Sequence, residues 1–131
     1  MSTLKVNNLQ DVNGANNSTP SEVANGRAKA FANVETSTST STGQQKTINS
    51  SYNISSVVDI AQGINQVNFT TAFANSNYVA LATAGHNNQS DNNNSACEIR
   101  EVATTGFKVI MEDVDGAFAD RDKLFIVIFS A

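Results

Sequence analysis

Apolar and polar residues alternate along much of this chain with a period of two. The alternation is clearest in residues 51–83, where β-branched and aromatic residues alternate with Asn, Ser, Thr and Ala. This pattern is typical of half-buried strands. The segment contains very few titratable side chains, so it predicts a scaffold of three strands joined by turns, with function in surfaces and loops.

Across the whole chain, six to eight short strands are predicted, with Gly- and Asn-containing turns between them and no helical periodicity. This arrangement predicts an all-β fold, an antiparallel β-sandwich or jelly roll. A Ser/Thr-rich segment, residues 35–45, is expected to form an exposed ribbon or loop. The candidate strands are residues 27–34, 47–58 with a break near Ser55 and Ser56, 64–70, 78–84, 96–103, 107–112 and 123–130.

The last candidate strand is apolar on both of its faces. Such a strand is expected at the centre of a sheet or in a contact between subunits, because an exposed one would promote aggregation. We therefore predict a symmetric oligomer, with the second of the two faces in the interface. The first face holds Leu124, Ile126 and Ile128, and the second holds Phe125, Val127 and Phe129.

The chain divides into an extended N-terminal arm, residues 1–25, and a β domain, residues 26–131. The arm is polar, and its few large apolar residues cannot form a core of their own. One interpretation is a tether that becomes ordered when it docks on a partner, and a disordered tail is the alternative. The residues predicted to dock are Leu4, Val6, Leu9 and Val12.

Composition narrows the set of partners. Only 15% of the residues are charged, and 18 Asn, 14 Ser and 12 Thr supply the polar surface instead. The formal net charge is −4 and the eight Lys and Arg are scattered, which argues against nucleic acid and anionic membranes as partners. The single cysteine, Cys97, excludes an intrachain disulfide and is expected to be a small buried hydrophobe.

The sequence contains no apolar run near the roughly 20 residues of a membrane span, and residues 1–10 lack the apolar segment of a signal peptide. We therefore expect a soluble protein that is made in a cytoplasm. No cofactor is predicted.

Antiparallel strands place alternate connections at the same end of a sandwich. We therefore expect residues 61–63, 85–95 and 113–122 at one end, with residues 71–76 and 104–106 at the other. The first end is rich in amides and carboxylates, which can pair with sugar hydroxyls, although solvated loops would have the same composition. The candidate receptor- or glycan-binding residues are His86, Asn87, Asn88, Asp91, Asn92, Asp113 and Asp115.

The sequence gives little support for catalysis or metal binding. His86 has no second histidine to form a metal site or a nucleophile pair, so a surface role is favoured. Residues 113–122 resemble a calcium loop in part, but Met111 stands where the first carboxylate belongs. A pair of glycosidase carboxylates would have to come from Asp59, Glu98, Glu101 or the acidic loop, and their spacing predicts no such pair. No metal site is therefore expected.

Aromatic residues are expected mainly in the core, and a stacking platform for sugars is the alternative interpretation. The residues concerned are Phe31, Tyr52, Phe69, Phe73 and Tyr78.

Several short motifs occur in an order that is familiar. After the polar arm come AKAF at residues 28–31, YNISS at 52–56, VNF at 67–69 and NY at 77–78. In this order they resemble the small β domain of tail-fibre and related appendage proteins of marine bacteriophages, including cyanophages. The chain departs from that pattern with Phe31 in place of Trp and Ile54 in place of Val.

The resemblance implies a non-enzymatic structural component of a phage virion, placed on a tail fibre, collar or capsid. It also implies a homotrimer that binds host-surface glycans. Because the domain is small, we hypothesise that residues 1–25 dock on other virion proteins while the β domain projects outwards. The protein would be synthesised in the bacterial host cytoplasm and reside in the virion. A carbohydrate-binding module is the alternative, and a polysaccharide depolymerase is a third interpretation.

Overall fold

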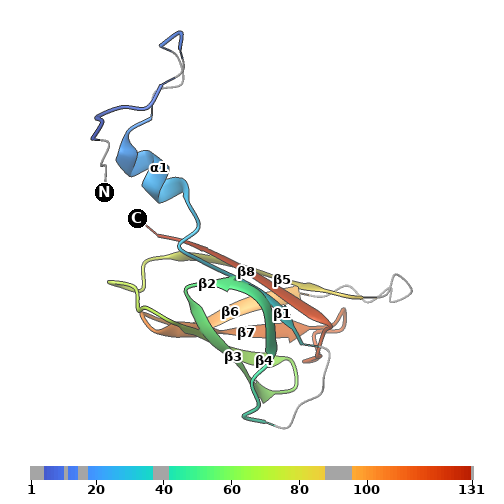
Figure 1. The fold of residues 1–131 in the computed structure, drawn as a ribbon. Coiled ribbons are helices and arrows are strands. Elements are labelled where there is room, and N and C mark those ends of the chain that lie inside the picture. The colour runs from blue at the N-terminus through green and yellow to red at the C-terminus, as the bar shows by residue number, and fades with distance from the viewer. Residues whose placement is uncertain (1–4, 11, 15–17, 37–41, 88–95, 131) are drawn as a thin grey trace.

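The computed structural model describes residues 5–10, 12–14, 18–36, 42–87 and 96–130. Its β domain is a sandwich, and a helix and the arm project from one end of it (Figure 1). The predicted all-β sandwich is therefore confirmed.

Eight strands of the described residues form two antiparallel four-stranded sheets that pack face to face. One sheet has the order β2–β1–β8–β5, and the other has the order β3–β4–β7–β6. The strands are β1 (Ala30–Glu35), β2 (Thr47–Tyr52), β3 (Ile54–Ala61), β4 (Ile64–Phe69), β5 (Val79–Gly85), β6 (Ala96–Ala103), β7 (Gly106–Glu112) and β8 (Lys123–Phe129).

The predicted strand of residues 47–58 is broken at Asn53, and not at the two serines. Asn53 has a left-handed φ of 54°, a conformation that asparagine tolerates better than most residues. Its side chain pairs with the backbone of Thr71, accepting from the N–H at 2.8 Å and donating to the carbonyl at 3.1 Å. The two halves, β2 and β3, therefore belong to different sheets.

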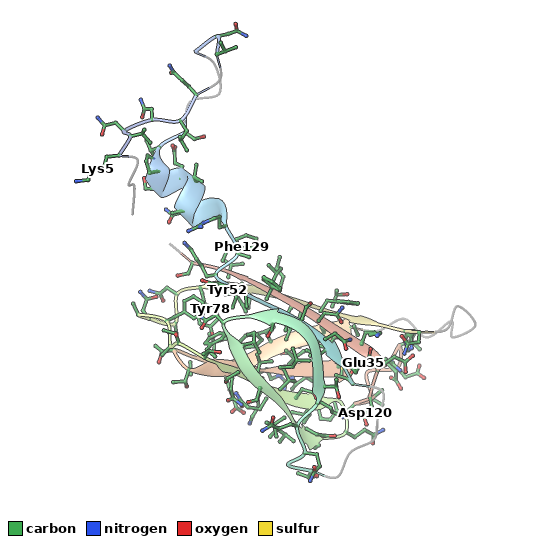
Figure 2. The ribbon with its side chains drawn as sticks, viewed as in Figure 1. Lys5, Glu35, Tyr52, Tyr78, Asp120 and Phe129 are labelled. Carbon is green, nitrogen blue, oxygen red and sulfur yellow. The ribbon has the colours of Figure 1, made fainter. Side chains whose placement is uncertain are left out.

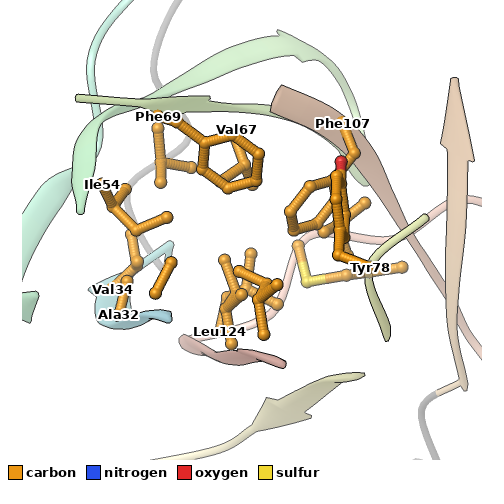
Figure 3. Packing of buried hydrophobic residues seen from close by; sticks show 14 residues of the cluster. Ala32, Val34, Ile54, Val67, Phe69, Tyr78, Phe107 and Leu124 are labelled. Atoms are coloured by element: carbon orange, nitrogen blue, oxygen red, sulfur yellow. The ribbon is translucent and has the colours of Figure 1, made fainter. Parts of the chain in front are cut away.

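The core lies between the two sheets and is built from alternate residues of the strands (Figure 3). Leu124, Ile126 and Ile128 are buried, and β8 lies between β1 and β5. Both the core face and the central position predicted for this strand are confirmed. Burying an aliphatic side chain of this size contributes about 1.5–3 kcal/mol.

Aromatic rings close the core near the β4–β5 connection. Phe69 packs edge-on against Tyr78 at a centroid distance of 5.6 Å and against Phe73 at 4.8 Å. The hydroxyl of Tyr78 donates to the carbonyl of Ala103 at 2.9 Å, so the buried phenol remains hydrogen-bonded. Three of the five aromatic residues are therefore core residues, as the core interpretation predicts.

A short helix, α1 (Pro20–Gly26), precedes the β domain. Thr19 caps it: the Thr19 hydroxyl accepts from the backbone N–H of Glu22 at 3.2 Å, and the Glu22 carboxylate accepts from the backbone N–H of Thr19 at 2.7 Å. This is a capping box with proline at the first helical position. The helix was not expected from the periodicity.

No helix within the part of the chain that the structure describes is long and apolar enough to cross a membrane.

Candidate functional site

Three connections meet at one end of the sandwich, as predicted. The backbone N–H of Gly63 donates to Asp120 Oδ1 at 2.8 Å, and the backbone N–H of Asn87 donates to Asp122 Oδ2 at 2.8 Å. We call this end the distal pole, and its described residues are 61–63, 85–87 and 113–122.

The opposite end carries the arm, and we call it the arm end. Here the backbone N–H of Phe73 donates to the carbonyl of Thr104 at 2.9 Å, so the two remaining connections also meet as predicted. Figure 2 shows Phe129 near the arm and Glu35 and Asp120 at the far end of the body. The domain therefore has two chemically different ends.

The turn at Gly63 is held tightly against the neighbouring loop. Gly63 has a φ of +69°, and a Cβ at this position would lie 2.5 Å from the carbonyl oxygen of Met111 and 2.7 Å from the nitrogen of Ala119. Both the left-handed backbone and the close approach require glycine. The distal pole is thus built on a packed base.

His86 lies beside Asp122 at the distal pole. Their Nδ1 and Oδ2 atoms are 3.8 Å apart, with the side chains 21% and 30% exposed. The histidine is therefore partly covered, where a surface residue was expected. Among the described residues, no group of three or more His, Cys, Asp and Glu side chains is placed to hold a metal ion.

Asp113 stabilises its own loop. One of its carboxylate oxygens, Oδ1, accepts from the backbone N–H groups of Asp115 at 3.0 Å and Ala117 at 2.9 Å. This is an Asx turn, and it agrees with the hairpin interpretation. The remaining candidates of the distal pole, Asn88, Asp91 and Asn92, lie outside the described residues.

A layer of buried polar side chains lies beneath the distal pole. Lys46 Nζ and Asp59 Oδ2 are 2.9 Å apart, and their side chains are only 1% and 5% exposed. Thr36 is fully buried and its hydroxyl donates to the carbonyl of Arg121. Sequence reasoning missed this layer, although a single charge inside the apolar run VVDIA around Asp59 implies a buried partner.

Arg121 is the second buried cation of this layer. It is 7% exposed, and one guanidinium nitrogen donates to the carbonyl of Glu112 at 3.4 Å. Its charge also acts on Cys97. Burial is the largest effect there and raises the pKa of the thiol, while a hydrogen bond to Ala84 and the charge of Arg121 lower that pKa by less. Cys97 is partly buried, which agrees with a packing role.

Three of the carboxylates considered for glycoside hydrolysis each pair with a cation, namely Asp59, Glu98 and Glu101. Besides the buried Asp59, Glu98 pairs with Arg100 at 2.6 Å and Glu101 with Lys108 at 2.7 Å. The hydrogen bond from Arg100 lowers the pKa of Glu98, and a carboxyl group with a lowered pKa is a poor general acid.

The described residues of the arm make local contacts and leave their apolar side chains exposed. Leu9 and Ser18 exchange two backbone hydrogen bonds, at 2.7 and 2.8 Å, which hold these two residues side by side ahead of helix α1. Leu9 is 43% exposed and Val12 is 99% exposed. Val6 is likewise exposed, and Leu4 lies outside the described residues.

The residues predicted for the oligomer interface lie on the outer face of the β2–β1–β8–β5 sheet. Phe125 is 41% exposed there, whereas Val127 and Phe129 are partly buried. Phe31 and Tyr52 lie on the same face and stack at a centroid distance of 6.2 Å. These two aromatic residues are therefore surface residues, contrary to the core interpretation.

A cavity of about 380 Å³ opens at the arm end. An aromatic residue and two threonines border it, but it lies far from the loops that the sequence suggested for ligand binding. Its lining residues are Tyr52, Asn53, Thr70 and Thr71.

The comparisons with known proteins support the fold. No family model and no curated protein matches the chain. A solved structure, the phiAB6 tailspike in complex with three-repeat oligosaccharides of Acinetobacter baumannii surface polysaccharide, matches with a TM-score of 0.50 and 15% identity. The match covers 76% of this chain and 19% of the tailspike, so this chain spans about a fifth of that protein. At this identity the likeness concerns the fold alone.

Proposed function

We propose that this chain is a non-enzymatic domain of a bacteriophage tail appendage that serves attachment to the host. The observation that carries the proposal is the fold likeness to a tailspike over 76% of the chain. The motif order of the sequence supports it independently, since it resembles tail-fibre domains of marine phages, cyanophages included. The domain is proposed to act in the virion after synthesis in the host cytoplasm.

The two ends of the domain suggest how it is oriented. Helix α1 and the arm leave the body at the start of β1, and the distal pole lies at the other end of that strand (Figure 1). We propose that the arm docks on another virion protein, at the tail, collar or capsid, and that the distal pole points outwards. The polar character of the pole agrees with a solvent-facing position.

The exposed valines provide the test of arm docking. Val12→Asp places a charge on an arm residue that is 99% exposed, and Val114→Asp does the same on a distal-pole residue that is 65% exposed. Neither change disturbs the core, so both proteins should fold. We expect Val12→Asp to reduce incorporation into particles at least tenfold, measured by quantitative mass spectrometry of purified virions, and Val114→Asp to incorporate normally. Equal incorporation of the two variants would refute arm docking.

We propose host-surface glycans as the target of the domain. The second candidate function is a lectin-like module that binds such glycans. The tailspike neighbour was solved with bound oligosaccharides, and the exposed Asn87 has its backbone, but not its side-chain amide, engaged by Asp122. A glycan array would identify a ligand. Binding should fall for Asn87→Ala and persist for Asn77→Ala, which changes an exposed asparagine at the arm end.

A separate experiment tests the proposal that the domain is not an enzyme. The polysaccharide of a susceptible host, incubated with the protein, should keep its length distribution in size-exclusion chromatography. Shortening of the polymer would instead favour the depolymerase interpretation.

The sequence resemblance also implies a homotrimer. Light scattering coupled to size-exclusion chromatography is expected to give three times the chain mass of 13.9 kDa.

A further inference from the structure

Strand β5 has its larger apolar side chains on the outer face of the sheet, whereas an isolated domain would normally bury them. Val79 and Leu81 point away from the core and are 60% and 57% exposed, whereas the alternate positions packed on the core are all alanine. In a sheet with one solvated face, the larger apolar residues normally face the core and polar residues face water. The core-packing residues are Ala80, Ala82 and Ala84.

The exposed apolar surface continues from β5 across the whole sheet. The strand register aligns Leu81 with Val127, Val127 with Phe31, and Phe31 with Tyr52. A hollow of about 180 Å³ lies between β5 and β8 beside this row. We define the apolar face as Phe31, Tyr52, Val79, Leu81, Phe125, Val127 and Phe129.

The outer face of the other sheet is different. There the row at the middle of the strands aligns Gln66 with Lys108 and Lys108 with Arg100. Glu98 on the same strand as Arg100 pairs with that arginine. One side of the sandwich thus has the surface of a solvated sheet, and the other has the surface of a buried one.

We infer that the apolar face is covered by a second copy of this chain. Within its described residues the face has no acidic or basic side chain. Charges occur only at its borders, with Lys29 at the arm end and the Glu35–Lys123 ion pair towards the distal pole. Near a symmetry axis each residue meets a copy of itself or of a neighbour, so a charged face would repel itself. A neutral apolar face suits self-association.

The area of the face is that of a large apolar patch and is smaller than one side of a whole interface. Combining the exposed fractions of its residues with side-chain areas gives roughly 500 Å² of apolar surface. The largest apolar patch on a typical monomer is about 300–600 Å², and a stable interface buries about 800 Å² on each partner. The apolar face therefore supplies the central part of a stable interface, and its polar border supplies the remainder.

The inference does not depend on the virion role. A protein that self-associates through this face but fails to enter particles would overturn only the proposed function. A protein that enters particles as a monomer would overturn the inference and the proposed homotrimer, and would leave the virion role standing.

The first experiment compares two lysine substitutions on edge strands. Leu81→Lys charges the apolar face, and Val102→Lys charges a residue of β6 that is 43% exposed on the other sheet. Light scattering after size-exclusion chromatography should give a multiple of 13.9 kDa for the wild type and Val102→Lys, and a single chain mass for Leu81→Lys. A wild type that stays monomeric at up to about 100 μM, which means an association free energy weaker than about 5 kcal/mol, would overturn the inference. An unchanged mass of Leu81→Lys would overturn it as well.

A second pair of variants keeps the face apolar and so avoids loss of folding as an explanation. The chain contains no tryptophan, so Leu81→Trp and Val102→Trp each introduce a single fluorescent reporter. On raising the protein concentration, the emission of Leu81→Trp should shift to shorter wavelength as the ring becomes covered, and that of Val102→Trp should not. Emission from Leu81→Trp at wavelengths as long as those of Val102→Trp, at concentrations at which light scattering finds an oligomer, would contradict coverage by a second copy.

Discussion

The ion pair between Lys46 and Asp59 allows a quantitative test of what stabilises the distal pole. Both side chains are at least 95% buried and the charged atoms are 2.9 Å apart. Asp59→Asn keeps the shape of the side chain but removes its charge, and so breaks the buried ion pair with the Lys46 ammonium. Breaking a buried pair in this way costs about 3–5 kcal/mol, a large part of the roughly 5–15 kcal/mol that stabilises a domain.

Urea denaturation followed by circular dichroism measures this loss. Since the urea dependence of a small domain is about 1–3 kcal/mol per M, the midpoint should fall by about 2 M. Replacing both partners, Lys46→Met with Asp59→Leu, removes the buried charges together and should recover most of the stability.

The exposed pair between Glu98 and Arg100 is the matched control. Its atoms are closer, at 2.6 Å, but both side chains are about half exposed. Solvent screens such pairs, so Glu98→Gln should leave the urea midpoint nearly unchanged. If Asp59→Asn shifts the midpoint no more than Glu98→Gln does, the argument that burial makes the inner pair essential is wrong.

Three further predictions address single positions. Gly63→Ala should lower the free energy of unfolding by about 1–3 kcal/mol, because its Cβ would lie 2.5 Å from the Met111 carbonyl; an unchanged urea midpoint would contradict the close approach. Burial raises the pKa of Tyr78, so the folded state holds the phenol proton more tightly than the unfolded state. Stability is then fully present below pH of about 10 and declines above it, and Tyr78→Phe should remove that decline at a cost of about 1 kcal/mol for the lost hydrogen bond to Ala103. Burial also raises the pKa of Cys97, so iodoacetamide at pH 8 should alkylate the folded protein at least tenfold more slowly than the urea-unfolded protein; equal rates would show that the thiol is accessible.

The strands could be predicted from the sequence because their signal is local. Six of the eight strands coincide with a predicted one to within a few residues, and β2 and β3 together cover the single candidate of residues 47–58, since alternation and turn residues lie next to each other in the chain. The meeting of the distal loops followed from antiparallel connectivity alone. The break at Asn53 could not be predicted in this way, because it depends on the pairing of Asn53 with Thr71, 18 positions away.

Other features could not be predicted because they depend on which side of a strand faces the core. The sequence around Val79 and Leu81 alternates large and small apolar residues, and periodicity alone favours the large ones inside. Only the packing of the sheets places the alanines there. Helix α1 is a different case, because the capping residues Thr19 and Glu22 were visible in the sequence but too few apolar residues follow them to give a helical period.

The continuity of the arm with β1 has a mechanical consequence. β1 is flanked by β2 and β8, and both ladders are antiparallel. Their backbone hydrogen bonds run perpendicular to the strand. A force that pulls on the arm while the distal pole is held would act along β1 and load both ladders in shear, so that many hydrogen bonds bear the tension at once. A strand at the edge of the sheet, pulled sideways, would instead lose its bonds one after another.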